Sequence, residues 1–330
     1  KIMPQGNSLT QFVLVRFGTT MFKLVLTLSA FYMFVYLCAE VTAIAKIVNL
    51  LSGFPLWQTS LLIIVTTLIY TLYGGLKASI FTDKIQFVII FIFLIIAIIQ
   101  VFTLETNTFS AELIKEKAGM LISGKYFYGY TAGLTFFIAV FATNLFDQGV
   151  WQRIYAAKSD KDLAIGLSSA FLIVLPFLII LGFFGILAVT LDIGKDPSTV
   201  FFSLLLNPMT GYNSILTISI LVLALSLVIS SMDTLINAIS SLVIVNGGEF
   251  FHLGSKALKH LSYILITIMS AIVLTIASKG FSVLFMFLFA DLLCCAALFP
   301  IFFGMFNKNI TKKVCFYSVI AGLVFGLALF

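Results

Sequence analysis

Long apolar runs alternate with short polar segments along almost the whole chain. Several runs exceed the roughly 18–20 apolar residues that a helix needs to cross a bilayer. The pattern predicts an all-α integral membrane protein, a single transmembrane domain over residues 1–330, with a short amphipathic helix over residues 9–17 and a short helix or loop over residues 197–206. About nine membrane-spanning helices are expected, over residues 23–51, 57–74, 79–104, 126–151, 163–191, 214–246, 258–278, 280–306 and 312–330.

One predicted span carries a polar stripe. Between residues 215 and 245 an otherwise apolar run contains Ser226, Ser230, Ser231, Asp233, Thr234, Asn237, Ser240 and Ser241. A carboxylate at bilayer depth costs roughly 2.5–3.5 kcal/mol, so Asp233 must face the bundle interior, water or an ion. Helical spacing gathers part of the stripe on one side: Ser230, Asp233, Thr234 and Asn237, with Ser231 at the edge. Such oxygen ligands suit a small hard cation.

Composition excludes several classes of protein. The chain is 61% hydrophobic and 10% charged, whereas a soluble domain averages about 45–50% apolar and about 25% charged residues. The net charge of +6 comes mostly from lysines in short segments between spans, which does not indicate a nucleic-acid partner. No nucleophile–base pair, histidine metal site or phosphate loop is recognisable, so we expect neither an enzyme nor a bound cofactor.

The basic residues also predict an orientation. If the segment before the first span is cytoplasmic, most Lys and Arg residues fall in cytoplasmic segments, as the positive-inside rule requires. We therefore expect a multi-pass protein of the plasma membrane with that orientation. The chain begins without an initiator methionine and stops inside an apolar run, so we expect both ends to be truncated and a longer protein to contain this segment.

Acidic residues inside the spans are the main candidates for chemistry. They are Glu40, Asp83, Asp147, Asp233 and Asp291. Ionisable residues within a membrane are functional candidates by default, because burying them is costly. The alternative is that each acid pairs locally with a serine, a backbone group or Lys46 and only fixes helix packing.

Four segments resemble motifs of the sodium/solute symporter family, which includes sodium-coupled sugar, proline, sialic acid, urea and monocarboxylate carriers. They are Gly74–Ala78 with Phe81-Thr82-Asp83 and Gln86; Asp147-Gln148 with Gln152-Arg153 and Ala156–Ser159; Ser230–Thr234 with Asn237; and Phe306 and Lys308 with Thr311–Lys313 and Ala321-Gly322. They occur in order across most of the chain, so together they are specific although each alone is weak.

The resemblance implies a LeuT-like fold of two inverted five-helix repeats around a site near the bilayer midplane, with the first core helices missing from this segment. It implies sodium as the coupling ion, held by the Ser230 and Ser231 hydroxyls and the Leu227 carbonyl. It also implies a candidate second cation site at Asp83, Asp233 and Thr234. An acid at Asp233, where such carriers often have serine, could strengthen that site or form a proton-sensitive pair with Asp83. The rest of the stripe, Ser226, Asn237, Ser240 and Ser241, is assigned to helix packing.

The substrate is a small polar solute, and the resemblance points to Asn144, Asp147, Gln148 and Asp291 as its contacts. Acids at Asp147 and Asp291 suit a solute with an amide or ammonium donor. An amino acid, urea or another nitrogenous solute is therefore favoured over a carboxylate, and a sugar ranks third. The lysine that sugar carriers use has no counterpart between Ala170 and Pro176.

Two other functional classes remain as alternatives. An ion channel is disfavoured, because no repeated filter-like loop is present and the polar residues concentrate on few helices. A transporter-like membrane sensor is the other, although the sequence contains no signalling module. Oligomeric state and ion stoichiometry stay open.

Overall fold

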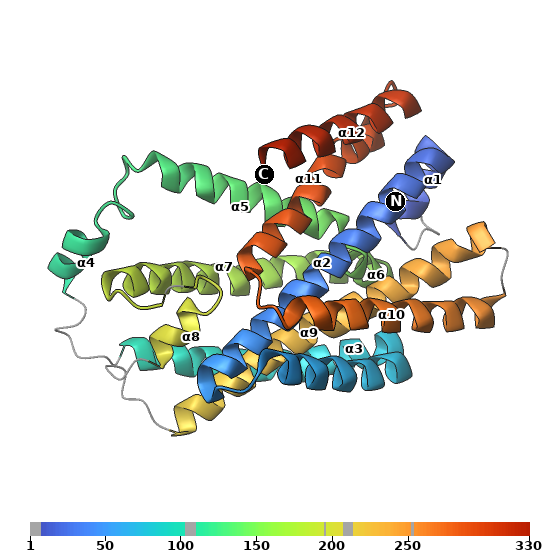
Figure 1. Cartoon of the computed structure of the whole chain (residues 1–330). Coiled ribbons are helices and arrows are strands. Elements are labelled where there is room, and N and C mark those ends of the chain that lie inside the picture. Colours follow the sequence, from blue (N-terminus) through green and yellow to red (C-terminus); the bar gives the residue numbers. More distant parts are fainter. Residues whose placement is uncertain (1–7, 103–109, 195, 207–213, 252–253) are drawn as a thin grey trace.

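The computed structural model describes residues 8–102, 110–194, 196–206, 214–251 and 254–330, and in these ranges every regular element is a helix. Of the described helices, eight are long and apolar enough to cross a membrane, which agrees with the predicted all-α membrane class. The elements (Figure 1) are α1 (Leu9–Phe17), α2 (Thr19–Ser52), α3 (Leu56–Phe102), α4 (Ala111–Ala118), α5 (Phe127–Phe146), α6 (Gln148–Ala156), α7 (Asp160–Thr190), α8 (Val200–Leu205), α9 (Ser214–Phe251), α10 (Ser255–Ala277), α11 (Val283–Phe306) and α12 (Lys312–Leu329).

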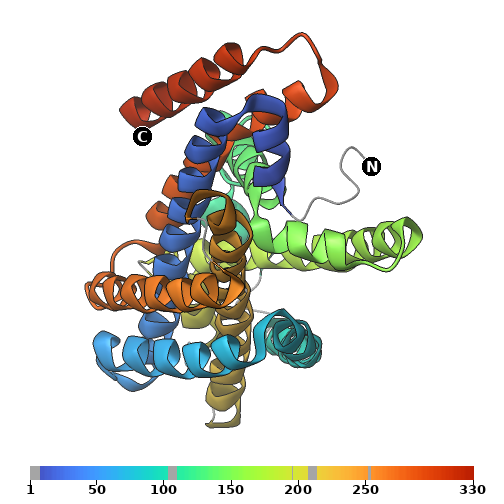
Figure 2. The same ribbon diagram turned by 90° about the vertical axis from the view of Figure 1, so that its right-hand side faces the viewer.

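The difference between nine predicted spans and eight observed helices lies in α3. The element α3 contains two helices that meet at a kink at Gly75, whose φ is 57°. They correspond to the predicted spans 57–74 and 79–104, of which residues 103 and 104 lie outside the described residues. A positive φ of this kind favours glycine, because it has no Cβ to clash with the backbone. The two halves of α3 run in different directions (Figures 1 and 2), so a kink at one residue connects the two predicted spans.

A second difference is a break in the predicted span 126–151. The chain leaves the helical conformation at Asp147, which ends α5 and begins α6. The Asp147 Oδ1 atom accepts a hydrogen bond of 2.7 Å from the backbone N–H of Val150. This is an N-cap, and it satisfies an amide at the start of α6 that has no partner within the helix.

The other boundaries lie within a few residues of the prediction. The largest shift is in α9, which continues through Gly247 to Phe251 instead of ending at residue 246. The short helix predicted over residues 9–17 corresponds to α1, and the short helix or loop predicted over residues 197–206 contains α8.

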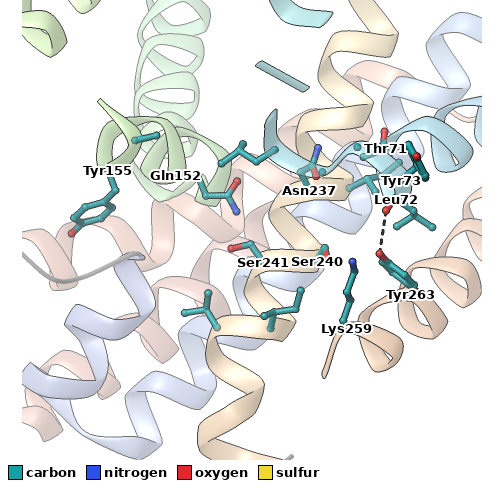
Figure 3. Close-up of a pocket in the computed structure, with 17 residues that line it drawn as sticks. Thr71, Leu72, Tyr73, Gln152, Tyr155, Asn237, Ser240, Ser241, Lys259 and Tyr263 are labelled. Atoms are coloured by element: carbon teal, nitrogen blue, oxygen red, sulfur yellow. Dashed lines mark hydrogen bonds between the residues drawn. The ribbon is translucent and has the colours of Figure 1, made fainter. Parts of the chain in front are cut away.

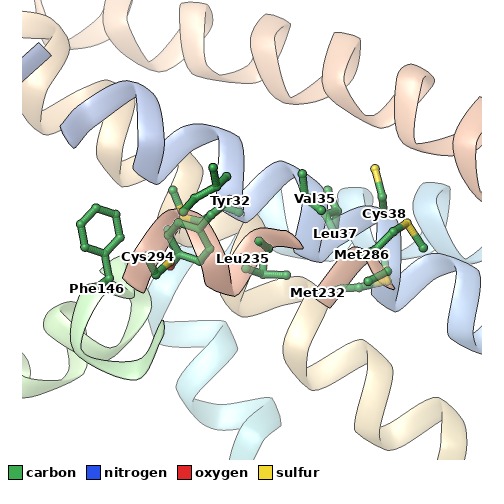
Figure 4. Close-up of a cluster of buried hydrophobic side chains, with 14 of the residues drawn as sticks. Tyr32, Val35, Leu37, Cys38, Phe146, Met232, Leu235, Met286 and Cys294 are labelled. Carbon is green, nitrogen blue, oxygen red and sulfur yellow. The ribbon is translucent and has the colours of Figure 1, made fainter. Parts of the chain in front are cut away.

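Helix α2 forms the centre of the described bundle. It contacts α1, α3, α9, α10 and α11, and its side chains Tyr32, Val35, Leu37 and Cys38 are buried against neighbouring helices (Figure 4). Met232 and Leu235 of α9 belong to the same hydrophobic cluster. The polar stripe of α9 is therefore carried by one of the helices that pack against α2.

Arg16 ties the start of the chain to the end of α11. Its Nη2 atom donates to the carbonyls of Asn307, Lys308 and Ile310 at 3.1–3.3 Å, and its Nε atom donates to Gly304 at 3.3 Å. A cation is favourable at a helix C-terminus, where carbonyl groups lack helical partners. This contact fixes α1 against the α11–α12 connection.

An ion pair joins α2 to the connection between α7 and α8. The Lys46 Nζ atom lies 2.8 Å from Asp196 Oδ2, and the Asp196 side chain is 39% exposed. Partial burial by itself would raise the pKa of Asp196, but hydrogen bonds from Lys46 and Ser198 outweigh it and lower the pKa below its usual value. The pair therefore favours the folded state while Asp196 is ionised.

Acidification should remove this contribution. Because the folded pKa of Asp196 is depressed, the contribution is complete above the unfolded value of about 3.9 and disappears as the pH falls through the folded pKa. We expect the unfolding temperature of the purified protein to fall less between about pH 5 and pH 3 in Asp196→Asn than in the wild type. Asp192→Asn, a nearby loop acid outside the ion pair, serves as the control. Equal pH dependence of Asp196→Asn and wild type would contradict this role.

Close packing predicts a second effect on stability. A Cβ atom at Gly304 would lie 2.3 Å from Cζ of the buried Phe17 ring, whereas one at Gly182 would meet no atom within 4 Å. Overpacking of this kind typically destabilises by about 1–3 kcal/mol. Gly304→Val should therefore lower the unfolding temperature in detergent more than Gly182→Val, and equal effects would refute the close contact.

Candidate functional site

The buried acid of the α9 stripe contacts α3. Asp233 is 0% exposed. Its Oδ1 atom accepts a hydrogen bond of 2.8 Å from Ser79 Oγ, and its Oδ2 atom accepts bonds of 3.0 Å from Thr82 Oγ1 and 3.2 Å from Tyr70 OH. Thr234 Oγ1 lies 3.3 Å from Oδ1. Several hydroxyl groups thus compensate for the water that a buried carboxylate loses.

Asp83 lies beside this cluster but pairs with an arginine. Its Oδ2 atom is 2.6 Å from Nη2 of Arg153 on α6, and its Oδ1 atom accepts a hydrogen bond of 2.9 Å from Ser230 Oγ. The same Nη2 atom donates to Thr234 Oγ1 at 2.8 Å. The structure therefore gathers Asp83, Asp233 and Thr234, the candidate second cation site, and places the Arg153 guanidinium against two of them.

The residues expected to hold the coupling sodium lie on the adjoining part of α9. Ser231 Oγ is 3.3 Å from the Leu227 carbonyl oxygen and donates to it. Such a bond to the carbonyl one turn earlier is common for serine in helices. The Glu40 carboxyl of α2 interacts with the Ser231 hydroxyl. Ser230, in contrast, is directed toward Asp83.

The two acids expected to contact substrate are both held by tyrosines of α2. The Tyr32 hydroxyl donates to Asp147 Oδ2. Asp291 Oδ1 accepts hydrogen bonds of 2.8 Å from Tyr36 OH and 2.5 Å from Thr143 Oγ1. The tyrosines lie one turn apart with ring centroids 6.0 Å apart in an edge-to-face arrangement. Residues from α2, α5 and α11 therefore bring the two carboxylates to one region.

Aromatic rings surround these carboxylates. Phe146 packs against Tyr32 at 5.9 Å between ring centroids, and Phe287 packs against Tyr36 at 4.8 Å. Among the residues that the structure describes, the salt bridges are Lys46–Asp196 and Arg153–Asp83, and neither involves Asp147 or Asp291. Tyrosine hydroxyls, aromatic faces and carboxylates outside these salt bridges suit a ligand that carries positive charge or N–H donors.

The two remaining candidate substrate contacts differ in their burial. Gln148 is buried, with 2% of its surface exposed, next to Asp147. Asn144 is exposed and donates a hydrogen bond of 2.8 Å to the Val140 carbonyl of its own helix. Gln148 is therefore buried directly after Asp147 in the chain. Asn144 is turned away from the carboxylates, because one residue of helical rotation separates it from buried Thr143.

Two cavities lie along α9, one on each side of residues 230–234. One, of about 320 Å³, is lined on α9 by Leu227 and Val228 and extends to Phe287 and to Pro197 near α8. The other, of about 610 Å³, is lined by residues of α3, α6, α9 and α10 (Figure 3). It includes Asn237, Ser240 and Ser241, so these stripe residues line a cavity and do not serve packing alone, although Ser240 Oγ also lies 3.3 Å from Ser262 Oγ. Residues 230–234 lie between the cavities along α9.

Several of these contacts were not predicted from the sequence. The donor Thr82 lies within the Phe81-Thr82-Asp83 motif and Ser79 lies two residues before it, so their positions could have suggested a role. Tyr32 and Tyr36 are four residues apart, so they lie on one face of a helix. Nothing in the sequence distinguishes them from the many other aromatic residues. Arg153 could have been singled out, since it is one of two arginines in the chain.

Comparison with known proteins identifies the family of this chain. The family model described as sodium:solute symporter family matches residues 6–322. The chain is also similar to a protein named spermidine transporter DUR31 of Candida albicans, with 28% identity over 309 residues, 92% of this chain and 56% of that relative. It thus spans about half the length of the curated relative that it matches. Because the family match covers nearly all residues, the chain belongs to the sodium:solute symporter family.

Proposed function

We propose that the protein containing this chain is a sodium-coupled secondary active symporter. It imports a small polar, nitrogen-containing solute across the plasma membrane by alternating access. The observation that carries the proposal is the pair of carboxylates, Asp147 and Asp291, held by neighbouring tyrosines and without a salt bridge among the described residues. A solute with ammonium or amide N–H groups would supply the missing donors and, if charged, neutralise them.

The substrate class follows from this charge balance. A carboxylate solute would be repelled by both acids, and a sugar would leave their charges uncompensated. The name of the similar Candida albicans protein, a spermidine transporter, adds support, because spermidine is a polyamine whose ammonium groups fit this chemistry. We therefore place polyamines beside urea and amino acids among the favoured solutes. Carboxylate or sugar transport, or a sensor built on a transporter, remain alternatives.

Sodium coupling is proposed to act through α9. Hydroxyls and a backbone carbonyl at Leu227, Ser230 and Ser231 would contribute neutral oxygen ligands, which favour weak and reversible binding of a small cation. The cavities on the two sides of residues 230–234 would let ion and solute reach the site from opposite faces in turn. The segment before α2 is proposed to be cytoplasmic, since most Lys and Arg residues then face the cytoplasm.

Removing the charge of Asp291 should weaken substrate binding. Asp291→Asn is expected to raise the KM for uptake about tenfold or more, because hydrogen bonds to charged groups contribute about 1.5–3 kcal/mol. The measurement is uptake of radiolabelled spermidine, urea and amino acids into vesicles that contain the whole protein.

The matched controls for this variant are Asn144→Ala, whose side chain faces away from the carboxylates, and Asp291→Glu, which keeps the charge. Asn144→Ala should leave KM within about twofold of wild type, since surface substitutions usually change free energies by less than about 0.5 kcal/mol. An unchanged KM in Asp291→Asn, with normal amounts of protein in the membrane, would refute the substrate assignment.

Removing the Ser231 hydroxyl should weaken sodium binding. Ser231→Ala is expected to raise the sodium concentration for half-maximal uptake about fivefold, which corresponds to the loss of one oxygen ligand worth about 1 kcal/mol. Ser226→Ala on the same helix is the control. A sodium dependence of Ser231→Ala that matches wild type would argue against this residue as a ligand.

A further inference from the structure

The cavity of about 610 Å³ between α3, α6, α9 and α10 contains polar side chains that have no partner in the described chain. Gln152 of α6 and Ser241 of α9 point into the same space (Figure 3). Both are half-buried, and neither side chain makes a hydrogen bond to a described residue. Polar groups inside proteins are usually hydrogen-bonded. Their donors and acceptors are therefore available to a ligand in this cavity.

One cation lies at the edge of the same cavity. Of the described residues that line it, Lys259 of α10 alone is charged. The Lys259 Nζ atom lies 5.6 Å from the centroid of the Tyr263 ring and forms no salt bridge with a described carboxylate. Tyr263 in turn donates a hydrogen bond of 3.1 Å to the Leu72 carbonyl of α3. An ammonium group without a counter-ion thus lies beside unpaired polar groups.

These groups together favour an anion with several acceptor oxygens. The amide of Gln152, the hydroxyl of Ser241 and the ammonium of Lys259 can all donate hydrogen bonds, and they come from three different helices. A phosphate group accepts hydrogen bonds in several directions, and lysine is a common partner for it. The lining residues include no carboxylate that would repel an anion.

The cavity lies at the cytoplasmic side if the segment before α2 is cytoplasmic. The first half of α3 then returns to that side at Gly75, which lines the cavity, and α10 begins there with the exposed residues Lys256 and Lys259. The cytoplasmic leaflet is rich in anionic phospholipids. A phosphate group can therefore come from a lipid headgroup or from a soluble phosphate compound.

We propose that this cavity binds a phosphate-bearing anion, with Lys259 as the charged contact and Gln152 and Ser241 as neutral donors. The ligand differs from both transported species, because its charge is opposite to that of sodium and of an ammonium solute. Once bound, it connects α6, α9 and α10 at the cytoplasmic end of the bundle. The inference depends on the cavity and its charge, not on the proposed symport.

The test is a titration of the whole purified protein with inorganic phosphate, in which potassium phosphate replaces potassium chloride at constant ionic strength. A ligand that binds the folded state raises the unfolding temperature as its site fills. Wild type should show a saturable rise with phosphate and none with chloride alone.

Two lysines of α10 provide a matched comparison. Lys259→Gln should raise the phosphate concentration for half-maximal effect about tenfold, because it removes a charged donor. Lys256→Gln removes the same charge from an exposed residue that does not line the cavity, and it should stay within about twofold of wild type. Equal effects of the two variants would overturn the proposal. Ser241→Ala, with an expected increase of about fivefold, replaces Lys259→Gln if that variant does not fold.

A second measurement identifies the source of the phosphate group. The protein is taken from vesicles of phosphatidylcholine and phosphatidylserine, and the lipids that it retains are counted by native mass spectrometry. Preferential retention of phosphatidylserine that Lys259→Gln loses and Lys256→Gln keeps would show a lipid site. A phosphate effect without such retention would show a soluble ligand.

Absence of both signals in wild type would overturn the proposal. Neither measurement follows sodium or solute, so that result would leave the proposed symport intact.

Discussion

A carboxylate inside an apolar helix bundle needs several hydrogen-bond donors at once, and this requirement shapes the centre of the protein. Asp233 takes donors from α3, Asp147 takes a hydroxyl from α2, and Asp291 takes hydroxyls from α2 and α5. In each case these hydroxyl donors lie on a different helix from the acid, although Asp147 also accepts a hydrogen bond from Val150 of α6, the helix that it caps. The acids therefore determine how α6, α9 and α11 lie against their neighbours, because moving a helix would leave a buried charge without partners.

Two interruptions in the helices make these contacts possible. The kink at Gly75 turns the second half of α3, so that Ser79 and Thr82 reach the stripe of α9. The break at Asp147 exposes backbone amides at the start of α6 and redirects the chain, which brings Arg153 to Asp83. Irregular backbone at membrane depth is tolerated where it is buried in protein or lines a cavity. Both interruptions lie at such places, and each carries groups that a straight helix would direct elsewhere.

Much of the fold was predictable from the sequence, and less of the site. Hydrophobic runs predicted the helices to within a few residues, since each run must match the bilayer thickness. They did not reveal that two predicted spans are joined at Gly75, because a glycine pair fits a loop or a kink equally well. The acids were recognisable because buried charge is rare. Their partners Tyr32 and Tyr36 were not, because tertiary packing alone brings them within reach of those acids. Arg153 stood out in the sequence, but its contact with Asp83 also depends on tertiary packing.

We propose that a sodium gradient drives accumulation of a nitrogenous solute by the protein that contains this chain. The most direct measurement is uptake by the whole protein in sealed vesicles, with a panel of urea, amino acids and spermidine. An inward sodium gradient should drive at least one of them above its equilibrium level, and an ionophore that dissipates the gradient should abolish the excess. Accumulation that is the same with sodium, with potassium in its place and with the ionophore would contradict the claim.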